Sequence, residues 1–287
     1  MQSSAMHAAM TIRTMAPEDV GLALDWAAAE GWNPGLSDAS PFAAVDPGGF
    51  LIGEVDGAPA AIVSCVNYDE RFAFLGFYIV RPDLRGRGYG RQIWQAAVAR
   101  AGTRLIGLDG VVAQQDNYRR SGFVLAHANV RYGGAPAPAA GMRSVPTVPL
   151  ASVAAGLVEA SEAAVFPAPR PDFLRRWIHA PGHHGRAVLR DGDLAAWGVI
   201  RPCREGRKIG PLVAADRAAA EAVLDDLLDV PAEGPVFLDV PATNGEAVRL
   251  AEARGLATVF ETARMYTGPA PPIRTDRIFG VTTFELG

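Results

Sequence analysis

A glycine-rich hexapeptide is the segment of this sequence best suited to bind an anion. It reads Arg85-Gly86-Arg87-Gly88-Tyr89-Gly90. Glycines let backbone N–H groups approach an anion closely, and the positive end of a following helix favours a phosphate. The spacing is not that of the dinucleotide fingerprint, which would need glycine at position 91, nor that of a P-loop, which needs a Lys-Ser/Thr pair. We therefore predict a pyrophosphate-binding loop rather than a plain strand-to-helix turn.

Alternating strand and helix patterns surround the hexapeptide. Asp56-Gly57 lies between two apolar runs and is a strong hairpin signal, and Pro17-Glu18-Asp19 suits the first turn of a helix. We predict strands at 11–15, 50–54, 58–67, 71–80, 105–109 and 124–132, and helices at 17–30, 89–101 and 114–120. The segment 31–49 is rich in Gly, Pro, Asp and Ser, which predicts a long ordered loop that could include a short helix. Loops of this length are often functional.

The same order of elements recurs later in the chain. The stretch 133–141 has no periodicity and is typical of an interdomain linker. Beyond it, we predict strands at 185–190, 194–201, 208–213, 235–240 and 258–267, and helices at 214–229 and 244–254. This repetition indicates an internal duplication of one α/β domain. The predicted division is an N-terminal domain at 10–133, a linker at 134–142 and a C-terminal domain at 143–287.

The composition restricts the partners of the protein. The 287 residues are enough for two domains, and 49% hydrophobic with 20% charged residues is ordinary for a folded protein. A net charge of −4, with arginines spread along the chain, lacks the electrostatic footprint of a nucleic-acid binder. No apolar run reaches membrane-spanning length, and the first residues lack the features of a signal peptide. We expect a cytoplasmic protein that binds neither nucleic acid nor membranes.

The cysteines and histidines give no metal signal. Cys65 and Cys203 lie far apart in apolar contexts, and His183-His184 follows a Pro-Gly turn without a carboxylate at ligand spacing. We expect two buried thiols and no metal site.

Two motifs resemble those of the GNAT superfamily of N-acetyltransferases. Arg85, Gly88 and Gly90 match the cofactor motif Gln/Arg-x-x-Gly-x-Gly/Ala, and Val80-Arg81-Pro82 upstream has the usual Val-x-Pro form. Tyr118-Arg119-Arg120-Ser121-Gly122-Phe123 is similar to the family's Tyr-x-x-x-Gly-Phe element. The resemblance implies an α/β (α+β) fold with a mixed, mostly antiparallel sheet, one splayed parallel strand pair and flanking helices, and acetyl-coenzyme A as the cofactor.

The resemblance also implies roles for individual residues. The pantetheine arm would lie against the backbone of Tyr78, Ile79 and Val80, and the pyrophosphate would be bound by residues 85–90. Tyr118 would be the general acid toward the departing thiolate, although a plain packing tyrosine would fit the same pattern. One departure is Val111, which stands where the family usually has an asparagine.

Carboxylates at the strand ends are candidates for the general base. Asp109 ends the strand that the resemblance makes part of the splayed pair, and Asp69 and Glu70 begin the preceding strand. For Asp69-Glu70 a hairpin turn is the competing interpretation.

The second copy resembles the C-terminal domain of tandem GNAT proteins related to the bacterial YitH type. Its strand-to-helix junction lacks the glycine spacing and carries Asp216, and Ala251 stands in the place of the tyrosine, so it should bind no coenzyme A. Asp239 and Glu285 are predicted to hold a cationic acceptor between the domains; the alternative is that they make structural hydrogen bonds in a purely structural copy.

The predicted function is transfer of an acetyl group from acetyl-coenzyme A to a primary amine of a small molecule or peptide. Two alternatives remain open. The chain could bind acyl-coenzyme A without turnover, as a sensor or regulatory module, or it could transfer a longer acyl group.

Overall fold

The computed structural model describes residues 9–137 and 145–287. Residues 138–142 of the predicted linker at 134–142 therefore lie outside the described residues, and Gly134 is the last residue of a strand. Among the described residues, no helix is both long enough and apolar enough to cross a membrane.

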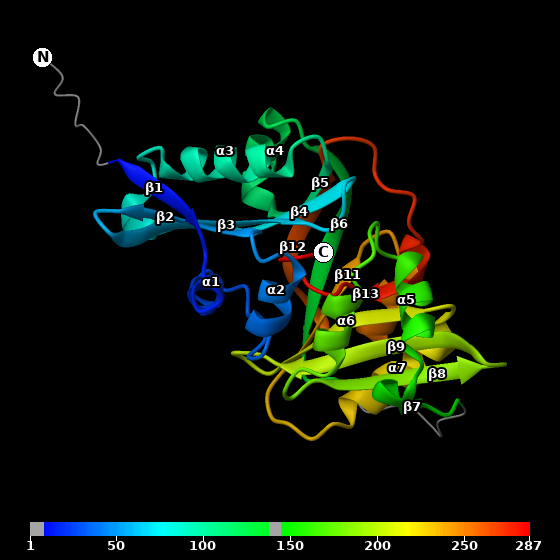
Figure 1. Cartoon of the computed structure of the whole chain (residues 1–287). Helices are drawn as coiled ribbons and strands as arrows, with labels where there is room; N and C mark the ends of the chain where they lie inside the picture. Colours follow the sequence, from blue (N-terminus) through cyan, green and yellow to red (C-terminus); the bar gives the residue numbers. More distant parts are fainter. Residues whose placement is uncertain (1–8, 138–144) are drawn as a thin grey trace, which may run out of the picture.

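The core of the molecule is one continuous mixed sheet, covered by helices on its faces (Figure 1). The strands are β1 (Met10–Thr14), β2 (Phe50–Val55), β3 (Ala58–Asn67), β4 (Phe72–Val80), β5 (Leu105–Val111), β6 (Val124–Gly134), β7 (Val148–Pro149), β8 (His184–Arg190), β9 (Asp193–Pro202), β10 (Arg207–Ala214), β11 (Val236–Pro241), β12 (Ala257–Tyr266) and β13 (Ile278–Gly280). The α-helices are α1 (Asp19–Ala29), α2 (Ala39–Val45), α3 (Tyr89–Ala101), α4 (Gln115–Arg120), α5 (Ala155–Ala163), α6 (Pro171–Ile178), α7 (Arg217–Leu228) and α8 (Gly245–Ala253).

The two halves of the chain exchange their closing strands. The order in the sheet is β1-β2-β3-β4-β5-β12-β6-β11-β10-β9-β8-β7. The strand β12 of the second half pairs with β5, and the strand β6 of the first half pairs with β11. The predicted domain boundaries therefore separate the halves along the chain but not in space, because each half is completed by a strand of the other.

The only parallel pairs recorded in the described part of the sheet are β4 with β5 and β10 with β11. The pairing of β4 with β5 ends at Leu75 and Leu108, although both strands continue, to Val80 and Val111. The strands thus splay beyond that point. Backbone groups on the facing edges then have no strand partner, which leaves hydrogen-bonding groups available to a ligand.

The corresponding gap in the second half is filled by the chain itself. β10 and β11 pair from Arg207–Val236 to Ile209–Leu238 and then separate. The short strand β13 pairs with β10 at Leu212, and the Val281 amide beyond it donates to the Asp239 carbonyl, 2.7 Å. A Cβ at Gly280 would lie 2.8 Å from the Leu238 side chain, so this close approach requires glycine.

The helices bind the two halves into a shared core. Phe42 of α2 and Trp177 of α6 belong to one buried cluster, and their rings stack with centroids 6.0 Å apart. Neither α5 nor α6 is among the elements predicted from the sequence. Together with the strand exchange, this cluster makes each half depend on the other for its fold.

Candidate active site

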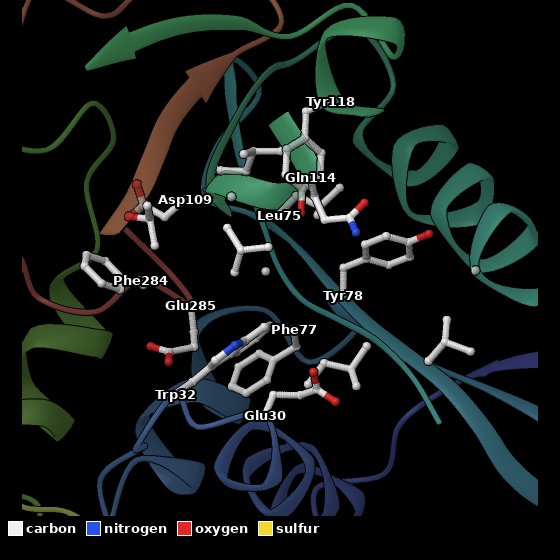
Figure 2. Close-up of a pocket in the computed structure, with 18 of the residues that line it drawn as sticks. Glu30, Trp32, Leu75, Phe77, Tyr78, Asp109, Gln114, Tyr118, Phe284 and Glu285 are labelled. Atoms are coloured by element: carbon white, nitrogen blue, oxygen red, sulfur yellow. The ribbon is translucent and has the colours of Figure 1, made fainter. Parts of the chain in front are cut away.

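A cavity of about 460 Å³ opens between the splayed ends of β4 and β5. Its walls are the end of α1, β4, the loop 85–91, β5, β12 and the last residues of the chain. Figure 2 shows Tyr78 at one side and Asp109, Phe284 and Glu285 at the other. Both halves therefore contribute to one site.

The glycine loop forms one end of this cavity. Gly86 and Gly88 have positive φ angles of 77° and 86°, a backbone conformation that side chains disfavour. A Cβ at either position would meet no atom within 4 Å, so the space above them is open. Among the described residues, the amides of Gly86, Arg87 and Gly88 donate no hydrogen bond to another backbone group. The open face and the free amides suit an anion.

The other predicted loop residues have different surroundings. Arg85 lines the cavity, donates from Nε to the Val80 carbonyl (2.9 Å) and forms an ion pair with Glu30 of the α1 C-terminus. Arg87 is exposed and does not line the cavity. Tyr89 is buried with Leu84, so it anchors the loop rather than facing a ligand.

Strand β4 contributes Tyr78, Ile79 and Val80 to the wall, as predicted for the pantetheine arm. Gly90 packs on this strand: a Cβ there would lie 2.7 Å from the Tyr78 hydroxyl. Glycine at this position therefore brings the first turn of α3 against the strand.

Tyr118 lies on α4 with its ring in the cavity wall. The ring stacks on Trp94, with centroids 5.6 Å apart, and only 7% of the residue is exposed. A Cβ at Gly110 would lie 2.2 Å from the ring, so glycine in β5 is what allows it to lie against the strand. Burial and the nearby Tyr78 raise the pKa of the Tyr118 phenol, which keeps its proton available at neutral pH.

The predicted base Asp109 lines the cavity but is engaged by other side chains. Arg264 of β12 donates to both of its carboxylate oxygens, each at 2.7 Å, and Asn129 of β6 donates at 2.8 Å. Burial raises the pKa of Asp109, and the Arg264 guanidinium and the Asn129 amide oppose that rise. The geometry is that of an ion pair that fixes β5 against the exchanged strands.

Glu70, the other predicted base, lies outside the cavity. It is exposed in the turn between β3 and β4, where Asp69 accepts from the amides of Arg71 and Phe72. This position agrees with the alternative of a hairpin turn. Glu70 is outside the cavity because the turn precedes the start of β4, whereas the cavity lies along the other end of that strand.

The two carboxylates predicted to hold the acceptor have different places. Asp239 is fully buried, does not line the cavity, and receives two hydrogen bonds from Arg131, at 2.6 and 2.8 Å. This position agrees with the alternative that Asp239 makes structural hydrogen bonds. Glu285 lines the cavity and is 3% exposed. A Cβ at Gly76 would lie 2.1 Å from the Glu285 carbonyl, so glycine in β4 admits the end of the chain.

The sequence matches known acetyltransferases over both halves. The model described as "Acetyltransferase (GNAT) family" matches residues 18–123, and the model described as "Acetyltransferase (GNAT) domain" matches residues 158–280. The holothin acyltransferase of Pseudoalteromonas sp. (strain SANK 73390) is 31% identical over 288 residues, covering 98% of this chain and 96% of the relative. The chain belongs to the GNAT acetyltransferase family.

Solved structures share the fold of this GNAT protein. A candidate acetyltransferase from Pyrococcus horikoshii aligns with a TM-score of 0.83 at 21% identity, covering 97% of this chain and 96% of its own. A tandem GNAT protein from the clavulanic acid biosynthesis pathway aligns with a TM-score of 0.64 at 17% identity, covering 91% of this chain and all of its own. The predicted tandem GNAT architecture and mixed sheet are confirmed, and the family establishes the protein as an acyltransferase.

Several lining residues of the GNAT site were not predicted from the sequence. They are Glu30, Trp32, Phe77, Phe260, Thr262 and Phe284. The composition of the segment 31–49 indicated a functional loop, which is a signal for Trp32. No local pattern brings β12 next to β5 or the last residues of the chain next to β4, because both contacts join segments that lie far apart in the sequence.

Proposed function

We propose that this protein transfers an acetyl group from acetyl-coenzyme A to a primary amine that binds between the two halves of the chain. One observation carries the proposal. A single cavity begins at the glycine loop, follows the unpaired ends of β4 and β5, and ends at Tyr118 and the wall made by the second half.

The residues present fit coenzyme A. The open glycines and unbonded amides of the loop suit a pyrophosphate, and Arg85 and Arg91 line the same end of the cavity. The backbone of Tyr78–Val80 on β4 faces the gap left by the splay, where it offers N–H and C=O groups to an amide-containing arm. When bound, acetyl-coenzyme A supplies the acetyl group as an activated thioester.

Tyr118 is proposed as the proton donor. Its phenol oxygen makes no hydrogen bond to another described residue, and its raised pKa keeps it protonated where a thiolate would need a proton. For a protonated amine, two protons must leave the nitrogen during the overall reaction. One replaces the proton that Tyr118 donates to sulfur, and the other goes to solvent or to a carboxylate of the wall.

The acceptor and the acyl chain are open to a direct test. The relative named for holothin is described as an acyltransferase, so holothin is a reasonable acceptor to try, and longer acyl thioesters belong in the panel beside acetyl-coenzyme A. Calorimetry should detect acetyl-coenzyme A binding, and thiol release should follow on adding an acceptor. Binding without thiol release for any amine would support the sensor alternative, and absence of binding would overturn the proposal.

A further inference from the structure

One acid that lines the cavity lacks the partner that the other two have. The three lining carboxylates are Glu30, Asp109 and Glu285. Glu30 pairs with Arg85, and Asp109 pairs with Arg264. In residues 9–137 and 145–287, the Glu285 carboxylate makes neither a hydrogen bond nor an ion pair. Only 3% of the Glu285 residue is exposed, and a carboxylate in such a place without a direct partner is costly, so a ligand cation in the cavity would offset that cost.

The cations near Glu285 are held by other groups. Arg131 binds Asp239 at 2.6 Å, and Arg201 binds Asp38 at 3.0 Å. The ammonium of Lys208, which is 1% exposed, donates to the Asn33 carbonyl at 2.9 Å and the Trp32 carbonyl at 3.4 Å. Burial also lowers the pKa of Lys208, which weakens it as a countercharge. Among residues 9–137 and 145–287, these three cations act on Glu285 only through their longer-range charge, and none of them makes a hydrogen bond or ion pair with its carboxylate.

The surroundings of Glu285 suit the body of an organic ammonium ion. Figure 2 shows the Trp32 ring next to Glu285, and Phe77 and Phe284 are part of the same wall. Aromatic faces attract cations and cover apolar groups. A second polar group completes the wall: Thr262 is 2% exposed, lines the cavity, and its Oγ1 has no hydrogen-bond partner. A hydroxyl buried without a partner is also destabilising unless a ligand reaches it.

From these contacts we infer that the acceptor is a compact primary ammonium ion with an apolar body. Its charge binds Glu285, its body lies against Trp32 and Phe284, and Thr262 bonds to one of its polar groups. This inference rests on the proposed function and names the substrate class of that site. The cavity of about 460 Å³ must also hold the acyl end of the cofactor, so a compact molecule fits better than a protein chain.

A matched pair of ligands tests the charge without any catalysis. The pair is 2-phenylethylamine, which is an ammonium ion at pH 7, and 2-phenylethanol, which has the same body and no charge. Calorimetry on the full chain with coenzyme A should give at least about tenfold tighter binding of the amine, the scale of one charge-assisted contact in a buried site. Equal affinities, or no detectable binding of the amine, would overturn the inference.

Variants assign that preference to one carboxylate. Glu285→Gln keeps the shape and should remove the amine preference, whereas Glu70→Gln, a matched change in the exposed turn outside the cavity, should leave it intact. Acetyl-coenzyme A affinity should be unchanged in both variants. A Glu285→Gln protein that still prefers the amine sinks this inference but not the proposed function, which is tested separately by acetyl-coenzyme A binding and thiol release with the unmodified chain.

Discussion

The two splayed strand pairs of this protein share one backbone plan and have different contents. Between β4 and β5 the gap is a cavity, whereas between β10 and β11 it is filled by β13. The start of the helix that connects the two strands of each pair also differs between the halves. Gly88 begins α3 with an open left-handed residue, while Asp216 caps α7 by accepting from the Ala219 amide at 2.9 Å. The second half thus has the same scaffold, and its own chain occupies the gap that is open in the first half.

The same comparison shows that the second half is more than a filled copy. After β13 the chain crosses to the first half, where Phe284 and Glu285 become part of the cavity wall. Tyr68 fixes this end by donating from its hydroxyl to the Leu286 carbonyl, 2.7 Å. The segment that fills one gap thus continues into the proposed acceptor side of the other.

The largest expected effect comes from giving the first half the acidic helix start of the second. Gly88→Glu should abolish acetyl-coenzyme A binding in calorimetry, because it places a negative charge and a side chain where the phosphates are predicted to lie. Gly88→Gln is the matched control, since it shares the bulk and the backbone strain but not the charge. Unchanged affinity in the glutamate variant would show that the phosphate site lies elsewhere.

The next largest effect should come from removing the Tyr118 phenol, which has no counterpart in the second half. Tyr118→Phe should lower turnover by roughly 10²-fold, the scale of a general acid, with little change in cofactor affinity. Tyr78→Phe removes the neighbouring phenol and serves as the control. Because burial raises the pKa of Tyr118, the wild-type rate should show no loss from its ionisation up to about pH 10. A Tyr118→Phe enzyme with full turnover would exclude it from the mechanism.

A change at Asp239 should affect stability rather than acceptor binding. Asp239→Asn leaves the Arg131 charge buried without its carboxylate and should cost about 3 kcal/mol in urea unfolding. Burial by itself raises the pKa of Asp239, but Arg131, Lys208 and Arg201 together lower it more, so the folded pKa lies below the usual 3.8. The wild type should therefore hold this stabilisation above about pH 4 and lose it as the pH falls further, and the variant should show less of that acid dependence. A raised acceptor KM with unchanged stability would instead indicate that Asp239 contributes to acceptor binding.

The smallest effect is expected from Gly76→Ala. The added methyl group would collide with the Glu285 carbonyl and displace the end of the chain from β4. We expect the acceptor KM to rise about tenfold while cofactor affinity stays within about twofold. Gly156→Ala, at an exposed glycine of α5 with no positive φ and no atom within 4 Å of its Cβ, controls for the loss of a glycine. An unchanged KM would mean that this segment does not form the acceptor wall.

Local sequence was sufficient for most of the elements and for the glycine loop and Tyr118 of the candidate site. Helix α3 has the predicted bounds, and the hairpin at Asp56-Gly57 has the two positive φ angles, 51° and 75°, that its turn requires. The glycine loop and Tyr118 line the cavity because they lie a short distance along the chain after β4 and β5, whose ends form the cavity. Such features depend on neighbours a few residues apart, and the sequence specifies those directly.

Only the tertiary structure decided which half each closing strand completes. β6 and β12 occupy corresponding places in the two copies, so their local patterns do not distinguish the partners. Packing does: Tyr132 of β6 is buried in the core of the second half, and Ala263 and Met265 of β12 are buried with Phe123 of the first. The acceptor wall follows from this exchange. Thr262 and Glu285 reach β4 and β5 through contacts between residues more than 100 positions apart, which depend on the summed burial of both halves rather than on any local pattern.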